Sequence, residues 1–319
     1  MSRPKLRFFQ ACIATVLFAL LVPAAAVPQQ PTKLRIGAAA IDIGGIVYYA
    51  LDLGYFKQAG LDVEIVRSAN GPATAAAILG GTLDAGSGNA LSLAEAHERG
   101  LRFVFIAPGG AFTSTSPTSG LVAPKSSTAH TAKDFNNKTI AVATLGSLGE
   151  IAVRAWLDQG GADLKTIKFI ELPFSAMGPA ISGGRVDGAV MEDPALDNVL
   201  AGGDARLVAP VYAAIAPEFS EGGSFTTLEF ARTHPDVMRR YYTAVVAACR
   251  WANANQAASA KILEKYSGVP AATMTHRVHY LETLDAADLQ PLVNAAARYG
   301  PLKSPFPASE LIAPGLPPR

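Results

Sequence analysis

Two acidic residues stand where a predicted strand ends. Glu192 and Asp193 follow an apolar run over residues 186–191, which has the length and composition of a buried strand. Ligands of open α/β sheets bind at the carboxyl ends of strands, so both carboxylates are candidates for ligand contact. They would repel an anion, unless they meet an amine on the ligand or hydrogen-bond to a protonated group.

Three polar loops precede predicted helices. Their polar residues are Asp42, Gly44 and Gly45 in the first loop, Ser87 and Asn89 in the second, and Gly146 and Ser147 in the third. The unpaired N–H groups at the start of a helix favour an anion such as a sulfonate or a carboxylate. Each loop also has a purely structural interpretation, because glycine permits a tight turn and serine is a good N-cap.

Motifs for other kinds of chemistry are incomplete. A hydrolase nucleophile elbow requires glycine two residues before the serine, and Leu145 occupies that position here. Residues 86–89 resemble the start of a dinucleotide fingerprint, but Leu91 stands in place of the third glycine. His276 and His279 have helical spacing without a cysteine or a third histidine beside them. We therefore predict no catalytic residue, no metal site and no cofactor.

A helix, a glycine pair and a strand are predicted twice. Residues 78–85 (ILGGTLDA) and 181–188 (ISGGRVDG) share the isoleucine, both glycines and the aspartate in register. A strand, a helix and a second strand precede each copy. They span residues 34–40, 48–58 and 62–67 in the first copy, and residues 139–143, 150–159 and 166–171 in the second. Two similar α/β lobes with a cleft between them follow from this repeat.

The rest of the chain is predicted to link and cover these lobes. Residues 120–124 and 222–230 read as connecting strands. Helices are predicted over residues 236–255, 258–266, 271–277 and 286–298. We therefore divide the chain into lobe 1 (residues 33–122), lobe 2 (123–222) and a return segment with C-terminal helices that pack on the lobes (223–319).

The N-terminus has the three parts of a secretory signal peptide. Basic residues precede an apolar run over residues 8–22, and Ala24 and Ala26 supply a cleavage site. The run is shorter than the roughly 20 residues that a membrane-spanning helix needs. Cys12 lies inside the run, so a lipid-anchored cysteine is not indicated. We predict export to the periplasm and removal of residues 1–26.

Composition limits the possible partners. Only 17% of residues are charged and 50% are hydrophobic, as expected for sheets buried on both faces. The formal net charge is +1, and the predicted signal peptide carries the excess of basic residues. Such a chain has no electrostatic footprint for nucleic acid or an anionic membrane. Beyond the signal peptide Cys249 stands alone, so stability must come from core burial rather than from an intramolecular disulfide.

Several short motifs, in this order, resemble one family. They are K-L-R-I-G (33–37), G-Y-F-x-x-A-G-L-D-V-E (54–64), G-G-T-L-D (80–84), E-L-P-x-x-x-M (171–177), G-G-R-V-D-G-A (183–189) and E-D-P (192–194). Together they resemble the solute-binding proteins of ABC importers for nitrate, sulfonates, taurine and pyrimidine precursors, also called thiamine-biosynthesis-like proteins. The resemblance implies a two-lobed periplasmic-binding-protein fold of type II, each lobe a mixed sheet flanked by helices, which closes on its ligand.

The resemblance also implies a function and a site. We expect a monomer that binds a small, anionic organic solute and delivers it to the membrane permease of an ABC importer. By position, the ligand contacts fall on Asp42, Gly44, Gly45, Ser87, Asn89, Gly146, Ser147 and Glu192. Met191 stands where many family members have an aromatic residue, so the type of ligand stays open. A ring that stacks on the ligand would have to come from Tyr48, Phe112 or Phe174.

Other functions remain as alternatives. The ligand could be a pyrimidine or thiamine precursor. The family also has a pyrimidine-synthesising branch of similar fold, which depends on a cysteine-rich motif that this chain lacks. A third class is a periplasmic sensor, although the sequence shows no signalling segment.

Overall fold

The computed structural model describes residues 30–68, 70–274 and 276–317. The predicted signal peptide lies outside these residues, so its removal stays a prediction. Within the described ranges, no helix is both long and apolar enough to cross a membrane.

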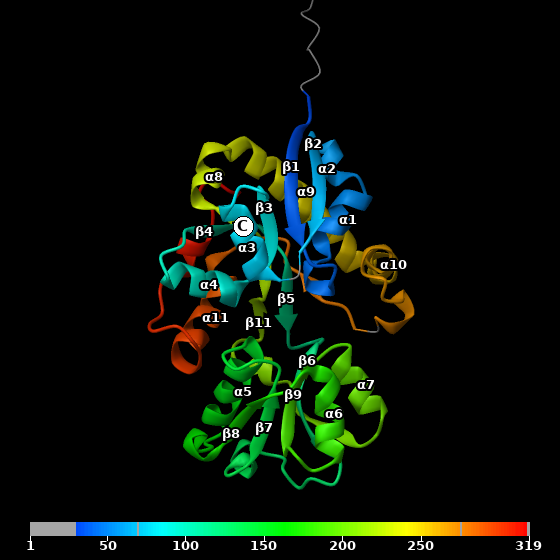
Figure 1. Ribbon diagram of the computed structural model, residues 1–319, viewed down its shortest axis with the longest axis vertical. Coiled ribbons are helices and arrows are strands. Elements are labelled where there is room, and N and C mark those ends of the chain that lie inside the picture. Colours follow the sequence, from blue (N-terminus) through cyan, green and yellow to red (C-terminus); the bar gives the residue numbers. More distant parts are fainter. Residues whose placement is uncertain (1–29, 69, 275, 318–319) are drawn as a thin grey trace, which may run out of the picture. The chain divides into compact units, whose positions relative to one another are not determined.

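The first lobe is built on a five-stranded sheet of order β2–β1–β3–β12–β4 (Figure 1). Its strands are β1 (Thr32–Ala38), β2 (Leu61–Arg67), β3 (Ala85–Asn89), β4 (Phe103–Pro108) and β12 (Gly222–Thr227). β1 runs parallel to β2 and β3, whereas β12 is antiparallel to both of its neighbours. The helices of this lobe include α1 (Ile46–Asp52), α2 (Tyr55–Gln58), α3 (Gly71–Leu79), α4 (Ala90–Glu98), α8 (Leu228–Thr233) and α9 (Pro235–Ala254). The long apolar face of α9 packs on α1 and β4.

The second lobe repeats this plan with the sheet order β10–β6–β9–β7–β8 (Figure 1). Its strands are β6 (Ser119–Pro124), β7 (Thr139–Val142), β8 (Lys168–Glu171), β9 (Gly188–Glu192) and β10 (Ala205–Ala209), and its helices are α5 (Leu148–Gln159), α6 (Phe174–Ser182) and α7 (Ala195–Ala201). β9 is parallel to β7 and antiparallel to β6. Two mixed sheets flanked by helices confirm the predicted fold class.

The predicted repeat corresponds to one hydrogen-bonded turn in each lobe. The backbone N–H of Asp84 donates to the carbonyl of Arg35 at 2.9 Å, and the N–H of Arg35 donates to Oδ2 of Asp84 at 2.7 Å. Asp187 makes the same pair of bonds with Thr139, both at 2.9 Å. The second glycine of each copy has a left-handed φ, 71° in one and 63° in the other, which ends the preceding helix. The shared aspartate therefore ties the turn to the first strand of its own repeat copy, β1 in one and β7 in the other.

The lobes are connected at other positions than the sequence indicates. Residues 120–124 and 222–230 were expected to cross between lobes, but β6 and β12 pair inside the two main sheets. Lobe 2 therefore begins at Ser119, not at residue 123. A third sheet of order β11–β5–β13 contains β5 (Gly110–Thr113), β11 (Glu218–Ser220) and β13 (His279–Tyr280). The crossing segments are residues 114–118, from β5 to β6, and residues 210–217, from β10 to β11.

Two predicted helices differ in the structure. The helix over residues 48–58 is divided into α1 and α2, because Gly54 between them has a φ of 74°. The prediction of a helix over residues 271–277 is wrong. Among the described residues of this range, the one helical element is the 3-10 turn η5 (Ala271–Thr273), and Arg277 beyond it is bound by Asp42. His276 and His279 consequently do not share a helix face.

The C-terminal helices α10 (Gln256–Ser267) and α11 (Ala286–Tyr299) complete the fold. α11 packs against α4 of the first lobe, α5 of the second lobe and β11. One buried apolar cluster consequently includes Phe105 of β4, Ile151 of α5 and Leu292 of α11.

Candidate functional site

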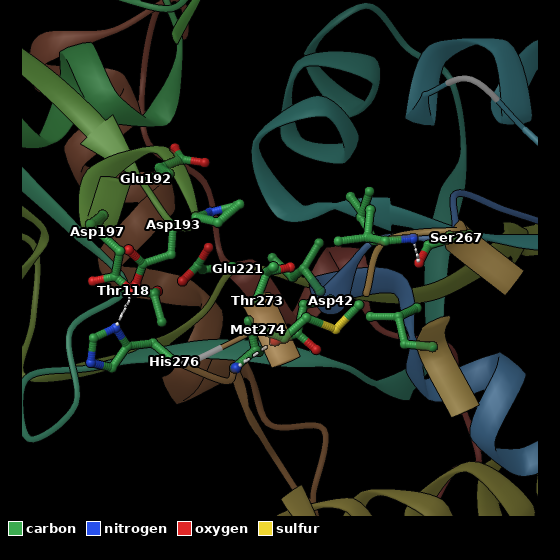
Figure 2. Close-up of a pocket in the computed structure, with 18 of the residues that line it drawn as sticks. Asp42, Thr118, Glu192, Asp193, Asp197, Glu221, Ser267, Thr273, Met274 and His276 are labelled. Atoms are coloured by element: carbon green, nitrogen blue, oxygen red, sulfur yellow. Dashed lines mark hydrogen bonds and ion pairs between the residues drawn. The ribbon is translucent and has the colours of Figure 1, made fainter. Parts of the chain in front are cut away.

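Two adjoining cavities lie beside the 3-10 turn η1 (Asp42–Gly44) of the first lobe. The larger has a volume of about 330 Å³ and the smaller about 200 Å³. Ile41 and Ile43 line both cavities and so form their shared wall. The second lobe contributes Ser119, Glu192, Asp193, Pro194 and Asp197 to the larger cavity, and the two crossing segments contribute Thr118 and Tyr212. The segment after α9 contributes side chains between Leu263 and Val278. In Figure 2 the side chains of Glu192, Asp193, Asp197 and Glu221 lie toward one side of the view, apart from Asp42.

Glu192 ends β9 and faces the larger cavity, as predicted for the end of this strand. The Tyr212 hydroxyl, on the 3-10 turn η4 (Val211–Ala214), donates to Oε1 of Glu192 at 2.6 Å. Glu192 is solvent-exposed and lines the cavity. The surrounding protein atoms still raise the pKa of its carboxyl by desolvation, while the Tyr212 hydrogen bond opposes that rise. Burial also raises the pKa of Tyr212 well above its usual value, so its hydroxyl stays a donor.

Glu221 is a second acid at the same cavity, and it is half-buried. It lies between β11 and β12, and its Oε1 is buried without a hydrogen-bond partner. Burial, and next the charge of Glu192, raise the pKa of the Glu221 carboxyl to about 8. At neutral pH this group is therefore held largely as the neutral acid, and a cation beside it would favour the carboxylate.

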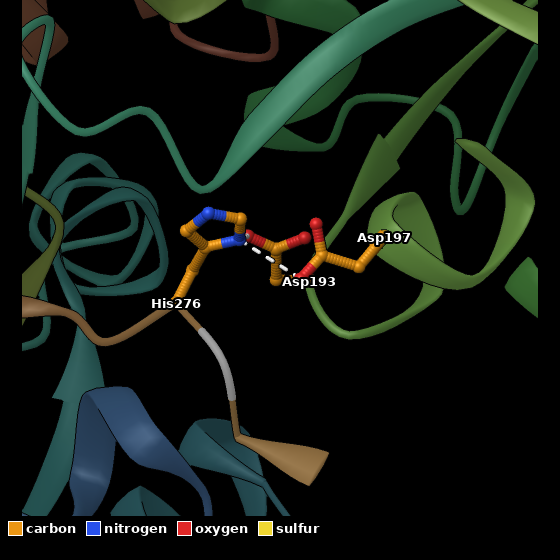
Figure 3. A group of neighbouring side chains, drawn as sticks. All are labelled: Asp193, Asp197 and His276. Carbon is orange, nitrogen blue, oxygen red and sulfur yellow. Dashed lines mark hydrogen bonds and ion pairs between the residues drawn. The ribbon is translucent and has the colours of Figure 1, made fainter. Parts of the chain in front are cut away.

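Two further acids, Asp193 and Asp197, contact His276 and so join the second lobe to the C-terminal segment (Figure 3). Nδ1 of His276 lies 2.8 Å from Oδ2 of Asp197 and 3.5 Å from Oδ2 of Asp193. Burial, followed by the charge of Asp197, raises the pKa of Asp193 to about 6. Among the described residues that line the larger cavity, His276 is the only one with a basic side chain.

Asp42 lines the larger cavity, but the protein itself binds its carboxylate. Nε and Nη2 of Arg277 donate to Asp42 at 3.0 and 2.6 Å, and the backbone N–H of Val278 donates to Oδ2 at 2.9 Å. The Arg277 side chain is only 5% exposed. This buried pair anchors the C-terminal segment to the first lobe, so Asp42 positions the wall of the cavity.

The smaller cavity brings together three of the predicted site residues. Gly44, Ser87 and Asn89 line it, along with Asn70 and Gly71. Asn70 caps α3 by accepting from Ala73 at 2.9 Å, and Asn89 caps α4 by accepting from Ser92 at 2.7 Å. The Ser87 hydroxyl is buried without a hydrogen-bond partner. Two helix N-termini and an unpaired hydroxyl favour an anionic group, and the described lining contains no carboxylate.

Gly45, Gly146 and Ser147 were predicted to contact ligand but line neither cavity. A side chain at Gly45 would meet the Tyr49 hydroxyl at 2.6 Å, so this glycine serves close packing. The Ser147 hydroxyl caps α5 by accepting from the backbone N–H of Glu150. The Glu150 carboxylate in turn accepts from the N–H of Gly146 at 2.6 Å. The protein's own carboxylate thus occupies the helix N-terminus that was expected to hold an anion.

The aromatic residues suggested for ring stacking do not line the cavities. Tyr48, Phe112 and Phe174 pack in the apolar clusters, and Tyr212 is the one aromatic side chain among the described residues of the larger lining. Sequence reasoning missed Tyr212 and Glu221. The only available signal was an acid directly before a predicted strand, at Glu221.

Two mixed sheets with cavities beside their connecting strands define the two-lobed periplasmic-binding-protein fold. The periplasmic aliphatic sulphonate-binding protein SsuA from Escherichia coli has this fold, with a TM-score of 0.72 and 19% identity over 90% of this chain and 99% of that chain. The periplasmic nitrate-binding protein NrtA from Synechocystis PCC 6803 has a TM-score of 0.59 and 15% identity over 76% and 68%. The desulfurization enzyme DSZB has a TM-score of 0.67 and 14% identity over 89% and 97%.

Sequence comparison places the chain in a family. The family model described as NMT1/THI5 like matches residues 44–259. The chain belongs to this family, as the order of its short motifs predicted. No curated protein matches the chain.

Proposed function

We propose that the protein is a periplasmic solute-binding protein that captures a small organic solute between its lobes and delivers it to the permease of an ABC importer. Its family and fold support this role, and so do the periplasmic binding functions of SsuA and NrtA, which share that fold. The predicted signal peptide agrees with a periplasmic location.

The solute carries a protonated nitrogen as well as an anionic group. The observation that carries this proposal is the pair of acids, Glu192 and Glu221, at a cavity where His276 is the one basic side chain of the described lining; the surrounding protein raises the pKa of both carboxyls. A simple anion in that space would meet the carboxyl groups of Glu192, Glu221, Asp193 and Asp197, and every one of them that is ionised would repel it. An ammonium group would instead meet carboxylates and so favour their charged forms.

The anionic group fits the smaller cavity. There the N-termini of α3 and α4 and the Ser87 hydroxyl offer donors, whereas the described lining has no acid. Ile41 and Ile43 line both cavities, and we infer that the cavities open to each other past these side chains, so that one short molecule occupies both. A short amino-sulfonate or amino-carboxylate has these properties, and taurine is the simplest example. This narrows the anionic solute expected from the sequence to a zwitterion.

Matched pairs of solutes test this proposal. Taurine differs from ethanesulfonate, and β-alanine from propionate, only by the amine. Isothermal titration should show that the amine-bearing member of one pair binds at least about 30-fold more tightly, which is about 2 kcal/mol. Equal affinities within both pairs, or tighter binding of the members that lack the amine, would contradict the proposal.

An enzyme remains the competing class, because DSZB shares the fold. The two residues that could be considered as nucleophiles, Cys249 and Ser147, both have structural roles. Cys249 is buried in α9, where burial raises the pKa of its thiol, and Ser147 is an N-cap. We infer a binder, and mass spectrometry of taurine recovered after incubation with the protein should show no product. Formation of a desulfonated or deaminated product would support the enzyme instead.

A further inference from the structure

Asp193, Asp197 and His276 form a cluster whose spacing suits a metal ion (Figure 3). One ligand atom from each lies within 4.8 Å of the other two. Nδ1 of His276 is 3.5 Å from Asp193 Oδ2 and 2.8 Å from Asp197 Oδ2. Donor atoms around tetrahedral zinc lie roughly 3.4 Å apart when metal–ligand distances are about 2.1 Å. The three atoms therefore need only small movements to surround one ion.

Asp193 provides evidence that is independent of the cluster's composition. Its side chain is 10% exposed, and both of its carboxylate oxygens are buried without a hydrogen-bond partner. Its remaining polar neighbours are the His276 imidazole at 3.5 Å and the backbone of Asp197. Buried carboxylates in proteins are normally paired, hydrogen-bonded or bound to a metal. An ion between Asp193 and His276 would give these oxygens a closer partner than the imidazole at 3.5 Å.

The backbone holds these three side chains in place from two directions. Asp193 closes the turn after β9, and its N–H donates to the carbonyl of Thr118 at 2.9 Å. Asp197 lies on α7 in the same lobe. His276 directly precedes Arg277, whose guanidinium is fixed by Asp42 of the first lobe. A bound ion would thus link the second lobe to the segment that the first lobe anchors.

We propose that Asp193, Asp197 and His276 bind one zinc ion, with a fourth coordination position open to the larger cavity. One imidazole nitrogen and two carboxylate oxygens are ligands that zinc accepts, whereas calcium and magnesium prefer oxygen alone. A fourth position held by water is typical of zinc sites with three protein ligands. The sequence predicted no metal site because the two aspartates are remote in sequence from His276. The zinc site does not rest on the class of solute proposed above.

Zinc titration of the purified full chain, freed of metal by chelation, tests this site. Isothermal titration with zinc chloride should give one ion per chain, and zinc should raise the melting temperature. His276→Ala and Asp197→Asn should each weaken zinc binding by at least about 100-fold, since direct ligands matter at least as much as their hydrogen-bonded supports. His279→Ala is the matched control, because it removes an exposed histidine three residues away and should bind zinc like the wild type.

Cobalt distinguishes this site from adventitious binding at the surface. The cobalt-loaded wild type and His279→Ala should show the intense visible absorption of tetrahedral coordination, and His276→Ala should not. Melting temperatures measured without metal report whether each variant folds, and Asp197→Asn provides a second variant if His276→Ala does not. The proposal is overturned if the wild type takes up no zinc, or if His276→Ala and Asp197→Asn both bind zinc as tightly as His279→Ala does.

Discussion

The hydroxyl of Tyr212 donates a 2.6 Å hydrogen bond to the carboxylate of Glu192. This bond joins η4 to the end of β9 and holds one oxygen of Glu192 against Tyr212. Glu192 can then present its other oxygen to a solute in the larger cavity. Since Tyr212 is 1% exposed and cannot turn away into solvent, the bond fixes the orientation of the carboxylate.

Tyr212→Phe removes this bond and keeps the ring. We expect the affinity for an amine-bearing solute to fall about 5-fold, because one hydrogen bond of about 1 kcal/mol no longer orients Glu192. Tyr299→Phe is the matched control, since Tyr299 donates to Oδ2 of Asp158 at the same 2.6 Å but lies outside both cavities. Equal loss of affinity in the two variants would show that Tyr212 has no special role.

Glu221→Gln should change how stability depends on pH. The folded protein holds the pKa of Glu221 at about 8, above the value of 4.5 for an ordinary glutamate, because of burial and the charge of Glu192. The folded state therefore binds more protons than the unfolded state between these values, and the wild type loses stability as pH rises through 8. Of the groups that face Glu221, Glu192 is acidic and Tyr212 stays protonated.

Glutamine cannot ionise, so the variant avoids this loss. Denaturant unfolding should show Glu221→Gln to be more stable than the wild type by on the order of 2 kcal/mol at pH 9, with a smaller difference at pH 5. Glu218→Gln, at an exposed position of the adjacent strand, should follow the wild type at both values. A difference that does not grow with pH would contradict the burial of a neutral acid at Glu221.

Two serines predicted to contact ligand should behave oppositely. Ser147→Ala removes the N-cap of α5, so the free energy of unfolding should fall by about 1 kcal/mol while solute affinity stays unchanged. Ser87→Ala removes an unpaired hydroxyl from the smaller cavity, so affinity should fall about 5-fold while stability changes little. Titration and denaturant unfolding of both variants check this. If only Ser147→Ala lost affinity, the result would support the sequence prediction that Ser147 contacts the ligand.

Arg277→Met should both destabilise the protein and weaken solute binding. It leaves the Asp42 carboxylate without its guanidinium partner, and breaking a buried pair in this way costs about 3 kcal/mol. The wall of the larger cavity from Ser267 to Val278 also loses its anchor. Arg250→Met is the control, because its pair with Glu282 is exposed and should contribute less than about 1 kcal/mol. Similar unfolding free energies for the two variants would contradict this anchoring role.

Local patterns were sufficient to predict the fold. The repeated Ile-Gly-Gly-Asp unit reflects one local hydrogen-bonded turn. Asp84 binds the backbone of β1 and Asp187 binds the backbone of β7. The pairing of β6 and β12 with strands remote in sequence left no comparable local pattern. Residues 120–124 and 222–230 read as connectors because the sequence of a single strand does not show which strand it will pair with.

Site residues were predictable only where they end a regular element. Glu192, Ser87 and Asn89 stand at strand ends or helix starts, and they line the cavities. The sequence pattern at Ser147 is similar, but Glu150 binds the same helix end from within the chain. His276 could not be found because its neighbours, Asp193 and Asp197, come from another lobe.

The central claim is that the Glu192 carboxylate recognises an amine on the solute. The most direct measurement is a cycle in which taurine and ethanesulfonate are each titrated into the wild type, Glu192→Gln and the control Glu218→Gln. We expect the preference for taurine to be at least about 30-fold in the wild type and in Glu218→Gln, and to fall below about 3-fold in Glu192→Gln, a coupling of more than about 1 kcal/mol. The same preference in Glu192→Gln as in the wild type, or no preference in either, would contradict the account.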